Sequence, residues 1–184
     1  KQFQSLELFN KFKKCWSSFD DKFRFDADQT LRVCSLGSKL HNYLMWSHYA
    51  NSHNGFCVEF DTIRLIQHLE QEFVNRDDLK LAEVRYLPAA PILDPNHMNI
   101  VAAYMINLTT KSESWEYEKE WRLILSGEGL GKFHELKLKP DIISAVYFGE
   151  KSNSWDVWDA RIKLKAFDPN IKCFNFKRVP GEFS

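Results

Sequence analysis

The sequence predicts a single α+β domain with mainly antiparallel sheet, about six to seven strands and about four to five helices. The 184-residue chain has the length of one domain, and its 44% hydrophobic and 27% charged residues are ordinary for a globular protein. Strand-like and helix-like runs follow one another irregularly, with several hairpin-length connections, which favours α+β over a doubly wound sheet. Since no repeat, low-complexity tract or linker divides the chain, we expect one domain over residues 1–184.

The first half of the chain alternates helix-like and strand-like periods. Phe9, Phe12 and Trp16 recur at helical spacing, whereas the strand-like runs are short and apolar. In order, the predicted elements are a helix ending near Asp20, a strand over Thr30–Leu36, a helix over Leu44–Ser52, a strand over Phe56–Phe60, a helix after Asp61 and a strand over Leu81–Leu87. The buried stripe of the helix after Asp61 is expected to contain Ile63, Ile66, Leu69 and Phe73.

The second half predicts one buried helix and a strand-rich end. The run from about Met98 to Leu108 is nearly all apolar, so we expect a buried helix there. Strands are expected over Trp121–Leu125, Phe133–Leu138, Ile143–Phe148 and Ile171–Phe176. Between the last two strands, Trp155, Trp158 and Ile162 lie on one face of a predicted helix.

The charge balance and the hydropathy argue against two classes of main partner. The 25 basic and 25 acidic residues cancel, so no electrostatic footprint indicates nucleic acid or an anionic membrane. The chain contains no apolar run of about 18 residues and no signal-peptide pattern. We therefore expect a cytoplasmic protein with no membrane partner.

Residues Met45–Gly55, the first cluster, concentrate ring and hydrogen-bonding side chains. On a helix, Trp46 and Tyr49 share one face, and Tyr49 lies between Met45 and His53 at spacings of four residues. The candidate substrate-binding residues are Trp46, Ser47, Tyr49 and His53, and the candidate catalytic residue is His48. The alternative is that the rings fill the core while the histidines bond to backbone carbonyls.

Residues Lys111–Arg122, the second cluster, combine acids, cations and rings. On an extended strand, Glu118, Glu120 and Arg122 point to one face. Carboxylates about 7 Å apart on that face repel by roughly 2.4 kcal/mol at an effective dielectric of about 20, so a covered face needs a cation nearby. Glu118 and Glu120 are candidate catalytic residues, and Lys111, Trp115, Tyr117 and Arg122 are candidate substrate-binding residues. The alternative is a solvated strand face with a surface ion pair.

Neither cluster predicts a metal site or a serine triad. No third ligand at a suitable spacing accompanies His48 and His53, so no metal is expected. A Ser-His-Asp triad is not supported either, because no strained Gly-x-Ser-x-Gly turn occurs.

The two clusters resemble the motifs of an uncharacterised bacterial family, one of the numbered domains of unknown function. The matching segments are Ser35-Leu36, Met45–Ala50, His53–Cys57, Lys111–Arg122 and Tyr147–Gly149. The resemblance extends from about Leu31 to Gly149 and supplies no activity. Family members carry an earlier Tyr-Lys-Tyr-like segment and a Phe-x-Asp-Pro-Phe-like loop, so the resemblance implies that this chain lacks part of the family's N-terminal segment.

The Glu118-x-Glu120 element is also similar to the Glu-x-Glu element of ADP-ribosyltransferases, which implies an ADP-ribosyltransferase-like fold with NAD as substrate. On this resemblance Glu120 is the catalytic carboxylate and Glu118 orients the acceptor. Tyr49 or Tyr117 stacks on nicotinamide, and His48 or His53 positions NAD. A fixed carboxylate suits this chemistry, because breaking an N-glycosidic bond creates an oxocarbenium-like ribose.

Three functions stay open from the sequence. The first is an NAD-consuming transferase or glycohydrolase, such as a bacterial toxin or anti-phage effector with a protein or nucleic-acid acceptor and a cognate antitoxin. The second is a hydrolase or nuclease that uses His48 or His53 with Glu120. The third is a non-enzymatic module that binds a nucleotide or a protein.

Overall fold

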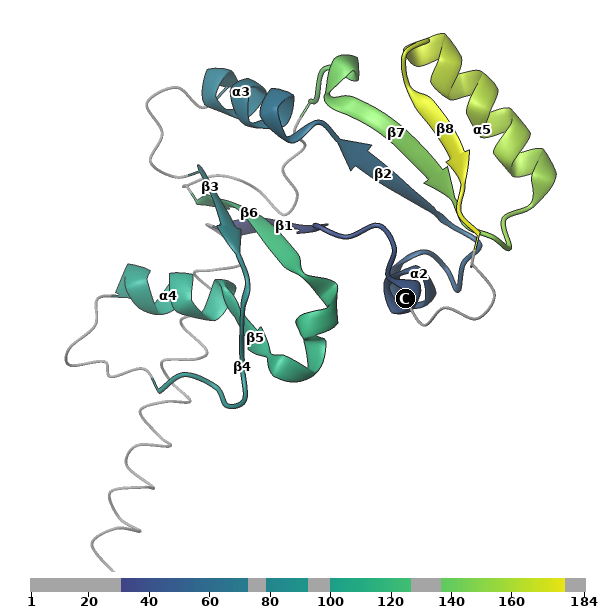
Figure 1. The fold of residues 1–184 in the computed structure, drawn as a ribbon. Coiled ribbons are helices and arrows are strands. Elements are labelled where there is room, and N and C mark those ends of the chain that lie inside the picture. Colours follow the sequence, from purple (N-terminus) through teal and green to yellow (C-terminus); the bar gives the residue numbers. More distant parts are fainter. Residues whose placement is uncertain (1–30, 73–78, 93–99, 127–136, 178–184) are drawn as a thin grey trace, which may run out of the picture.

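The computed structural model describes residues 31–72, 79–92, 100–126 and 137–177 (Figure 1). Within these ranges, helices are combined with open sheets, which confirms the predicted α+β class. Two three-stranded sheets form the framework, and a two-stranded pair stands beside the first of them. The segment that joins the two sheets carries the first cluster.

The first sheet holds the strand that carries Glu120. Its order is β1 (Leu31–Gly37), β6 (Glu120–Ser126) and β3 (Leu79–Glu83), with both pairings antiparallel. In the register of β1 against β6, Gly37 lies opposite Glu120 and Ser35 lies opposite Arg122. Because β6 is the central strand, backbone pairing on both sides helps to fix its position.

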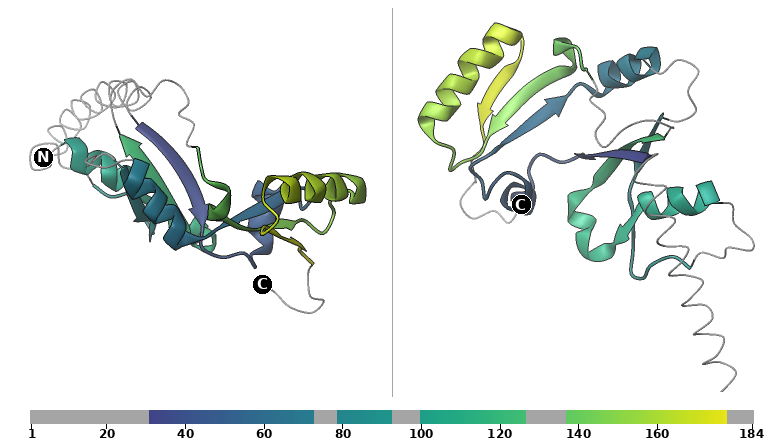
Figure 2. Two further views of the ribbon diagram at one scale, coloured as in Figure 1. Left: turned by 90° about the horizontal axis from the view of Figure 1, so that it is seen from above. Right: turned by 180° about the vertical axis from the view of Figure 1, so that it is seen from behind.

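The second sheet is covered on one face by a helix. Its order is β2 (Phe56–Phe60), β7 (Ile143–Phe148) and β8 (Lys172–Asn175), antiparallel between the first two strands and parallel between the last two. A parallel pair needs a crossover connection, which α5 (Ser154–Phe167) supplies. Val157, Ala160 and Leu164 of this helix pack against Val146 and Ile171, and α5 lies beside β7 and β8 in both views of Figure 2.

The remaining elements lead the chain into and out of the sheets. They are α2 (Tyr43–Tyr49), α3 (Thr62–Glu72), β4 (Arg85–Leu87), α4 (Ile100–Leu108), β5 (Thr110–Ser112), the 3₁₀ helix η1 (Glu113–Glu118) and the 3₁₀ helix η2 (Pro140–Ile142). The strands β4 and β5 pair in parallel, and β5 runs directly into η1. None of the described helices is long and apolar enough to cross a membrane.

The predicted strand over Leu81–Leu87 is wrong as a single element. It breaks at Val84, where the chain leaves the first sheet. The Val84 N–H donates to the carbonyl of Glu120 at 2.9 Å, whereas the next N–H, from Arg85, donates to the carbonyl of Thr109 at 2.8 Å. The two halves therefore belong to different sheets, and β4 and β5 add a parallel pair to the predicted antiparallel ones.

The buried stripe predicted for α3 is only partly right. Leu69 is buried as predicted, but Ile63 and Ile66 are exposed, and Leu65 and His68 are buried in their place. A ring nitrogen of His68 lies 3.0 Å from the carbonyl oxygen of Lys137, so a polar residue occupies a core position that a purely apolar pattern misses. Three predictions fall on residues outside the described ranges: the helix ending near Asp20, Phe73, and the start of the strand over Phe133–Leu138. The described end of that strand, Lys137 and Leu138, is not in a strand.

A close backbone approach at Gly149 holds the second sheet against the turn after α2. A Cβ added at Gly149 would lie 2.1 Å from the carbonyl oxygen of His53, far inside van der Waals contact. We predict that Gly149→Ala lowers the free energy of unfolding by about 2 kcal/mol through overpacking, as measured by urea denaturation.

Gly37→Ala is the matched control for this substitution. At Gly37 an added Cβ would lie 3.9 Å from its nearest neighbours, which is ordinary contact. Its free energy of unfolding is expected to stay within about 0.5 kcal/mol of the unsubstituted chain. Equal stability of the two variants would contradict the close approach.

Candidate functional site

A buried network of four charged side chains joins β5, η1 and β6. The Nζ of Lys111 donates to Oε2 of Glu118 and, at 3.4 Å, to Oε2 of Glu120. Arg122 donates to both oxygens of Glu120, from Nε at 2.8 Å and from Nη2 at 3.1 Å. Glu118 and Glu120 are 3% and 5% exposed, whereas the side chains of Lys111 and Arg122 are 23% and 17% exposed, so the carboxylates are buried and the cations reach partly to solvent. We call these four residues the buried charge network.

The left-handed residue Lys119 sets the directions of the two glutamates. It caps η1 with φ 44° and ψ 54°, and its N–H donates to the carbonyl of Glu116. The predicted extended strand through Glu118, Glu120 and Arg122 is therefore wrong, because Glu118 ends a 3₁₀ helix and β6 begins at Glu120. The two carboxylates nevertheless share Lys111 as a donor.

Hydrogen bonds at both ends of α2 fasten the first cluster to the second. At the last residue of the helix, the Tyr49 hydroxyl donates to Oε1 of Glu118 at 2.7 Å. At the N-cap, the Asn42 side-chain oxygen accepts two N–H groups of the first turn, and its Nδ2 donates to the carbonyl of Tyr117. The two clusters are therefore in direct contact.

Four neighbouring rings lie beside the buried charge network, which one of them, Tyr49, contacts directly. We call His48, Tyr49, Trp115 and Tyr117 the ring rim. The centre of the His48 ring lies 6.4 Å from those of Trp115 and Tyr117 and 6.3 Å from that of Tyr49. The Nζ of Lys111 lies 4.9 Å from the centre of the Trp115 ring, a cation–π distance. Tyr49 is 62% and Trp115 39% exposed, so the rim presents ring surface to solvent.

Fixed charge dominates the electrostatics of Glu120. Burial raises the pKa of this carboxyl, but hydrogen bonds from Arg122 and Ser35, with the charges of Arg122 and Lys111, outweigh it and hold the pKa at about 2. Glu120 is therefore an anion throughout the physiological range.

The pKa values of Lys111 and Tyr49 lie above their ordinary values. Burial alone would lower the pKa of Lys111, but the hydrogen bond to Glu118 and the charges of Glu120 and Glu118 raise it. The hydrogen bond to Glu118 is also the main cause that raises the pKa of Tyr49. At neutral pH the ammonium and the phenol both keep their protons, so neither is poised for general acid–base catalysis.

Two residues of the first cluster lie away from the ring rim. Trp46 is 3% exposed and stacks on Phe176 at a centroid distance of 4.5 Å, which is the core role that the sequence left as the alternative. His53 is also buried, with its ring 4.0 Å from that of Tyr43, and burial lowers its pKa. Ser47 accepts a backbone hydrogen bond from Ser52 at its carbonyl.

Three contributors to the site were not predicted. Asn42 precedes a helical run and is a favoured N-cap residue, so its capping role could have been predicted from the sequence. Its hydrogen bond to the Tyr117 carbonyl could not. Ser35 hydrogen-bonds Glu120 from the neighbouring strand. The hydroxyl of Tyr86 accepts the N–H of Glu120 at 2.8 Å, and no local pattern marks that contact.

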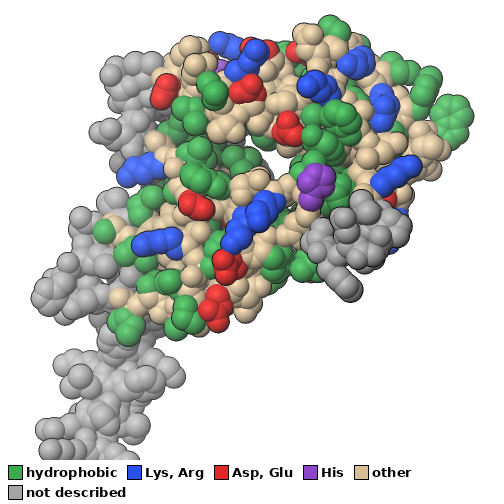
Figure 3. All heavy atoms as spheres, in the orientation of Figure 1, with side chains coloured by type: hydrophobic (Ala, Val, Ile, Leu, Met, Phe, Trp, Pro, Cys, Tyr) green, Lys and Arg blue, Asp and Glu red, His purple; other side chains and the backbone are tan. Residues whose placement is uncertain are grey.

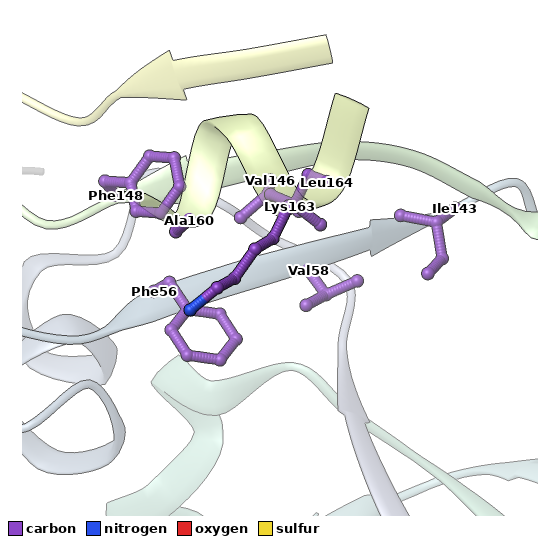
Figure 4. Close-up of a pocket in the computed structure, with 8 residues that line it drawn as sticks. All are labelled: Phe56, Val58, Ile143, Val146, Phe148, Ala160, Lys163 and Leu164. Carbon is purple, nitrogen blue, oxygen red and sulfur yellow. The ribbon is translucent and has the colours of Figure 1, made fainter. Parts of the chain in front are cut away.

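An apolar cavity of about 310 Å³ lies elsewhere, between α5 and the second sheet (Figure 4). Its lining includes Phe56, Val58 and Val146, with the Lys163 side chain extending across it, and none of the predicted site residues. On the face drawn in Figure 3, basic and acidic side chains of the described residues are interspersed, without a single-sign groove. Among the described residues, no group of three or more His, Cys, Asp or Glu side chains is placed to hold a metal ion.

Comparison with known proteins finds a family model that matches the part of the chain containing both clusters. Residues 45–123 match the model of a family described as Protein of unknown function (DUF2971). This match confirms the predicted uncharacterised domain family over that stretch. No curated protein and no solved structure matches the chain.

We predict that Glu120→Gln lowers the free energy of unfolding at pH 7 by about 3 kcal/mol, because it leaves Arg122 and Lys111 short of a buried counter-charge. The folded-state pKa of Glu120, about 2, lies below its ordinary 4.5, so the stabilisation is present above about pH 4.5 and is lost as the pH falls toward 2. Urea denaturation between pH 7 and pH 2 should show the difference between the two proteins shrinking over that window.

Glu116→Gln is the control for this comparison. Glu116 pairs with Lys119 on the exposed surface, where an ion pair contributes little. This variant is expected to follow the unsubstituted chain at every pH. A Glu120→Gln difference that stays constant down to pH 2 would show that charge is not the cause.

Proposed function

We propose that the ring rim binds a nucleotide through its flat base and that NAD is the substrate, cleaved at the bond between nicotinamide and ribose. The observation that carries this proposal is the 2.7 Å hydrogen bond between Tyr49, a solvent-facing ring, and the buried carboxylate of Glu118. It brings a negative charge directly behind an exposed aromatic surface. A base stacked on that surface holds its ribose next to the carboxylate.

The reaction needs a fixed negative charge more than it needs a proton carrier. When the C1′–N bond breaks, the electron pair leaves with neutral nicotinamide, and positive charge develops on the ribose. Water or a nucleophilic group of a protein or nucleic acid then forms the new bond at C1′ and releases one proton. The buried charge network suits this chemistry, because Glu120 is anionic at neutral pH and Lys111 keeps its proton.

Hydrogen bonding favours Glu118 over Glu120 as the carboxylate that contacts the ribose. Both oxygens of Glu120 are held by Arg122, whose guanidinium is also bound to the carbonyl of Leu108 at 2.8 Å. Glu118 instead shares its Oε1 with a residue of the rim. We therefore exchange the roles assigned from the sequence, so that Glu118 faces the substrate and Glu120 positions Lys111 and Arg122.

The cations and histidine nearest the rim supply contacts for the rest of the nucleotide. Lys111 lies beneath Trp115 and is partly exposed, so it can meet a phosphate oxygen at the edge of the stacking surface. His48 is exposed and stands next to the same rings. His53, buried beside Tyr43, has no part in this proposal.

One observation favours a second candidate, a nucleotide-binding module without catalysis. All four carboxylate oxygens of Glu118 and Glu120 already accept hydrogen bonds from the protein. Glu118 is also only 3% exposed, so Tyr49 or Lys111 must move before a ribose hydroxyl can contact its carboxylate. If neither side chain moves, the site binds a nucleotide and releases no product.

We predict that the purified chain releases nicotinamide from NAD, measured by chromatography, and that Glu118→Gln lowers the rate about 100-fold, because one fixed charge at the transition state is lost. Trp115→Ala is expected to weaken NAD binding about 10-fold through the loss of stacking, as measured by calorimetry.

Phe167→Ala removes an exposed ring on α5 and is the matched control, expected to leave both measurements unchanged. Saturable NAD binding without nicotinamide release would support the non-catalytic module. Unchanged release in Glu118→Gln would remove Glu118 from the reaction, and no binding of NAD at millimolar concentration would end the proposal.

A further inference from the structure

The helix α5 carries a second apolar face that the fold does not cover within the described residues. Trp155, Trp158 and Ile162 are 72%, 56% and 50% exposed. Their spacing of three and then four residues is that of a helix-pairing seam. The two indole rings meet edge to face at 5.7 Å. We call these three residues the α5 stripe.

The α5 stripe contributes nothing to the packing of α5 on its own sheet. That packing uses the opposite side of the helix, through Val157, Ala160 and Leu164. A helix that is apolar on both sides is normally buried on both sides. Two exposed tryptophans and an isoleucine in one line therefore mark a candidate interaction surface among the described residues. In Figure 3 apolar side chains stand at the surface where α5 lies.

We propose that the α5 stripe binds the α5 stripe of a second copy of this chain, with the two helices antiparallel. The charges beside the stripe are self-complementary in this arrangement. Asp159 and Lys163 lie on one flank and pair within the helix at 2.5 Å. When two copies cross near residue 160, the acid of each copy lies opposite the base of the other, so one pair becomes an alternating group of four charges.

The side chains of the α5 stripe are also complementary in size when the two helices run antiparallel. In the antiparallel register Trp158 of each copy faces Ile162 of the other, and Trp155 faces the small, exposed Ala166. The large rings thus meet a side chain that leaves room for them. A parallel pairing would instead place Trp155 against Trp155, and it would bring opposite flanks of the two helices together, so Asp159 of one copy would not meet Lys163 of the other.

Sedimentation of the 184-residue chain over an about hundredfold concentration range tests this proposal. A reversible monomer–dimer equilibrium is expected, and Trp158→Glu should raise its dissociation constant at least about 10-fold, as expected for a central anchor. Ile63→Glu, which changes an exposed isoleucine on α3 in the same way, should leave the equilibrium unchanged. Thermal melting of each variant checks that it remains folded.

Exchanging the charges of Asp159 and Lys163 distinguishes this specific pairing from nonspecific hydrophobic association. Lys163→Asp should weaken the dimer, because it places acids opposite acids on the flank. Adding Asp159→Lys to that variant should restore the dimer, because both the intrahelical pair and the pair between copies return with reversed sign. The proposal would be overturned if the chain stays monomeric or if Trp158→Glu leaves the dimer unchanged. It would also be overturned if the double variant dimerises no more tightly than Lys163→Asp, or if the chain binds lipid vesicles instead of itself.

Discussion

The carboxylate of Glu118 is the contact on which the site depends. One oxygen accepts from Tyr49, 69 residues earlier in the chain, and the other accepts from Lys111 on the preceding strand. These bonds join α2, which follows the first sheet, to the turn that opens β6. Without them the ring rim would be two unrelated pairs of side chains on separate elements. Asn42 adds the matching bond at the other end of α2, so the helix is held at both termini.

A buried network of this kind has a cost that apolar packing does not have. Four charged side chains lose most of their hydration, and only good geometry between them offsets that loss. Arg122 supplies such geometry, because its planar guanidinium spans both oxygens of Glu120 and uses its remaining nitrogen on the Leu108 carbonyl. The formal charges of Lys111, Glu118, Glu120 and Arg122 sum to zero, so the network itself carries no net charge. The low pKa of Glu120 follows from this pairing.

Sequence periodicity predicted several elements correctly but did not predict how the strands pair. The strands Phe56–Phe60 and Ile143–Phe148 have the predicted bounds, since alternation and flanking turn residues are local signals. The break at Val84 was hidden, because it is caused by two partners, Glu120 and Thr109, that are distant in sequence. The same limit applies to Glu118 and Glu120, whose convergence depends on the left-handed turn at Lys119. A spacing of two residues predicted a shared strand face, yet the shared ammonium of Lys111 brings the carboxylates together.

Burial divides the ring residues of the two clusters into those that pack inside the fold and those that can contact a ligand. Trp46 and His53 were as plausible as ligand contacts in the sequence as Tyr49 and Trp115, since all four are rings in polar surroundings. In the fold the first two are buried in the scaffold, and the last two remain open to solvent above a network of fixed charge. The charged groups of the network already orient one another beneath the exposed rings. Few side chains therefore need further ordering when a flat ligand binds. Less of the binding free energy is then lost in ordering the site, which is why the proposed chemistry is placed at this surface rather than at the apolar cavity beside α5.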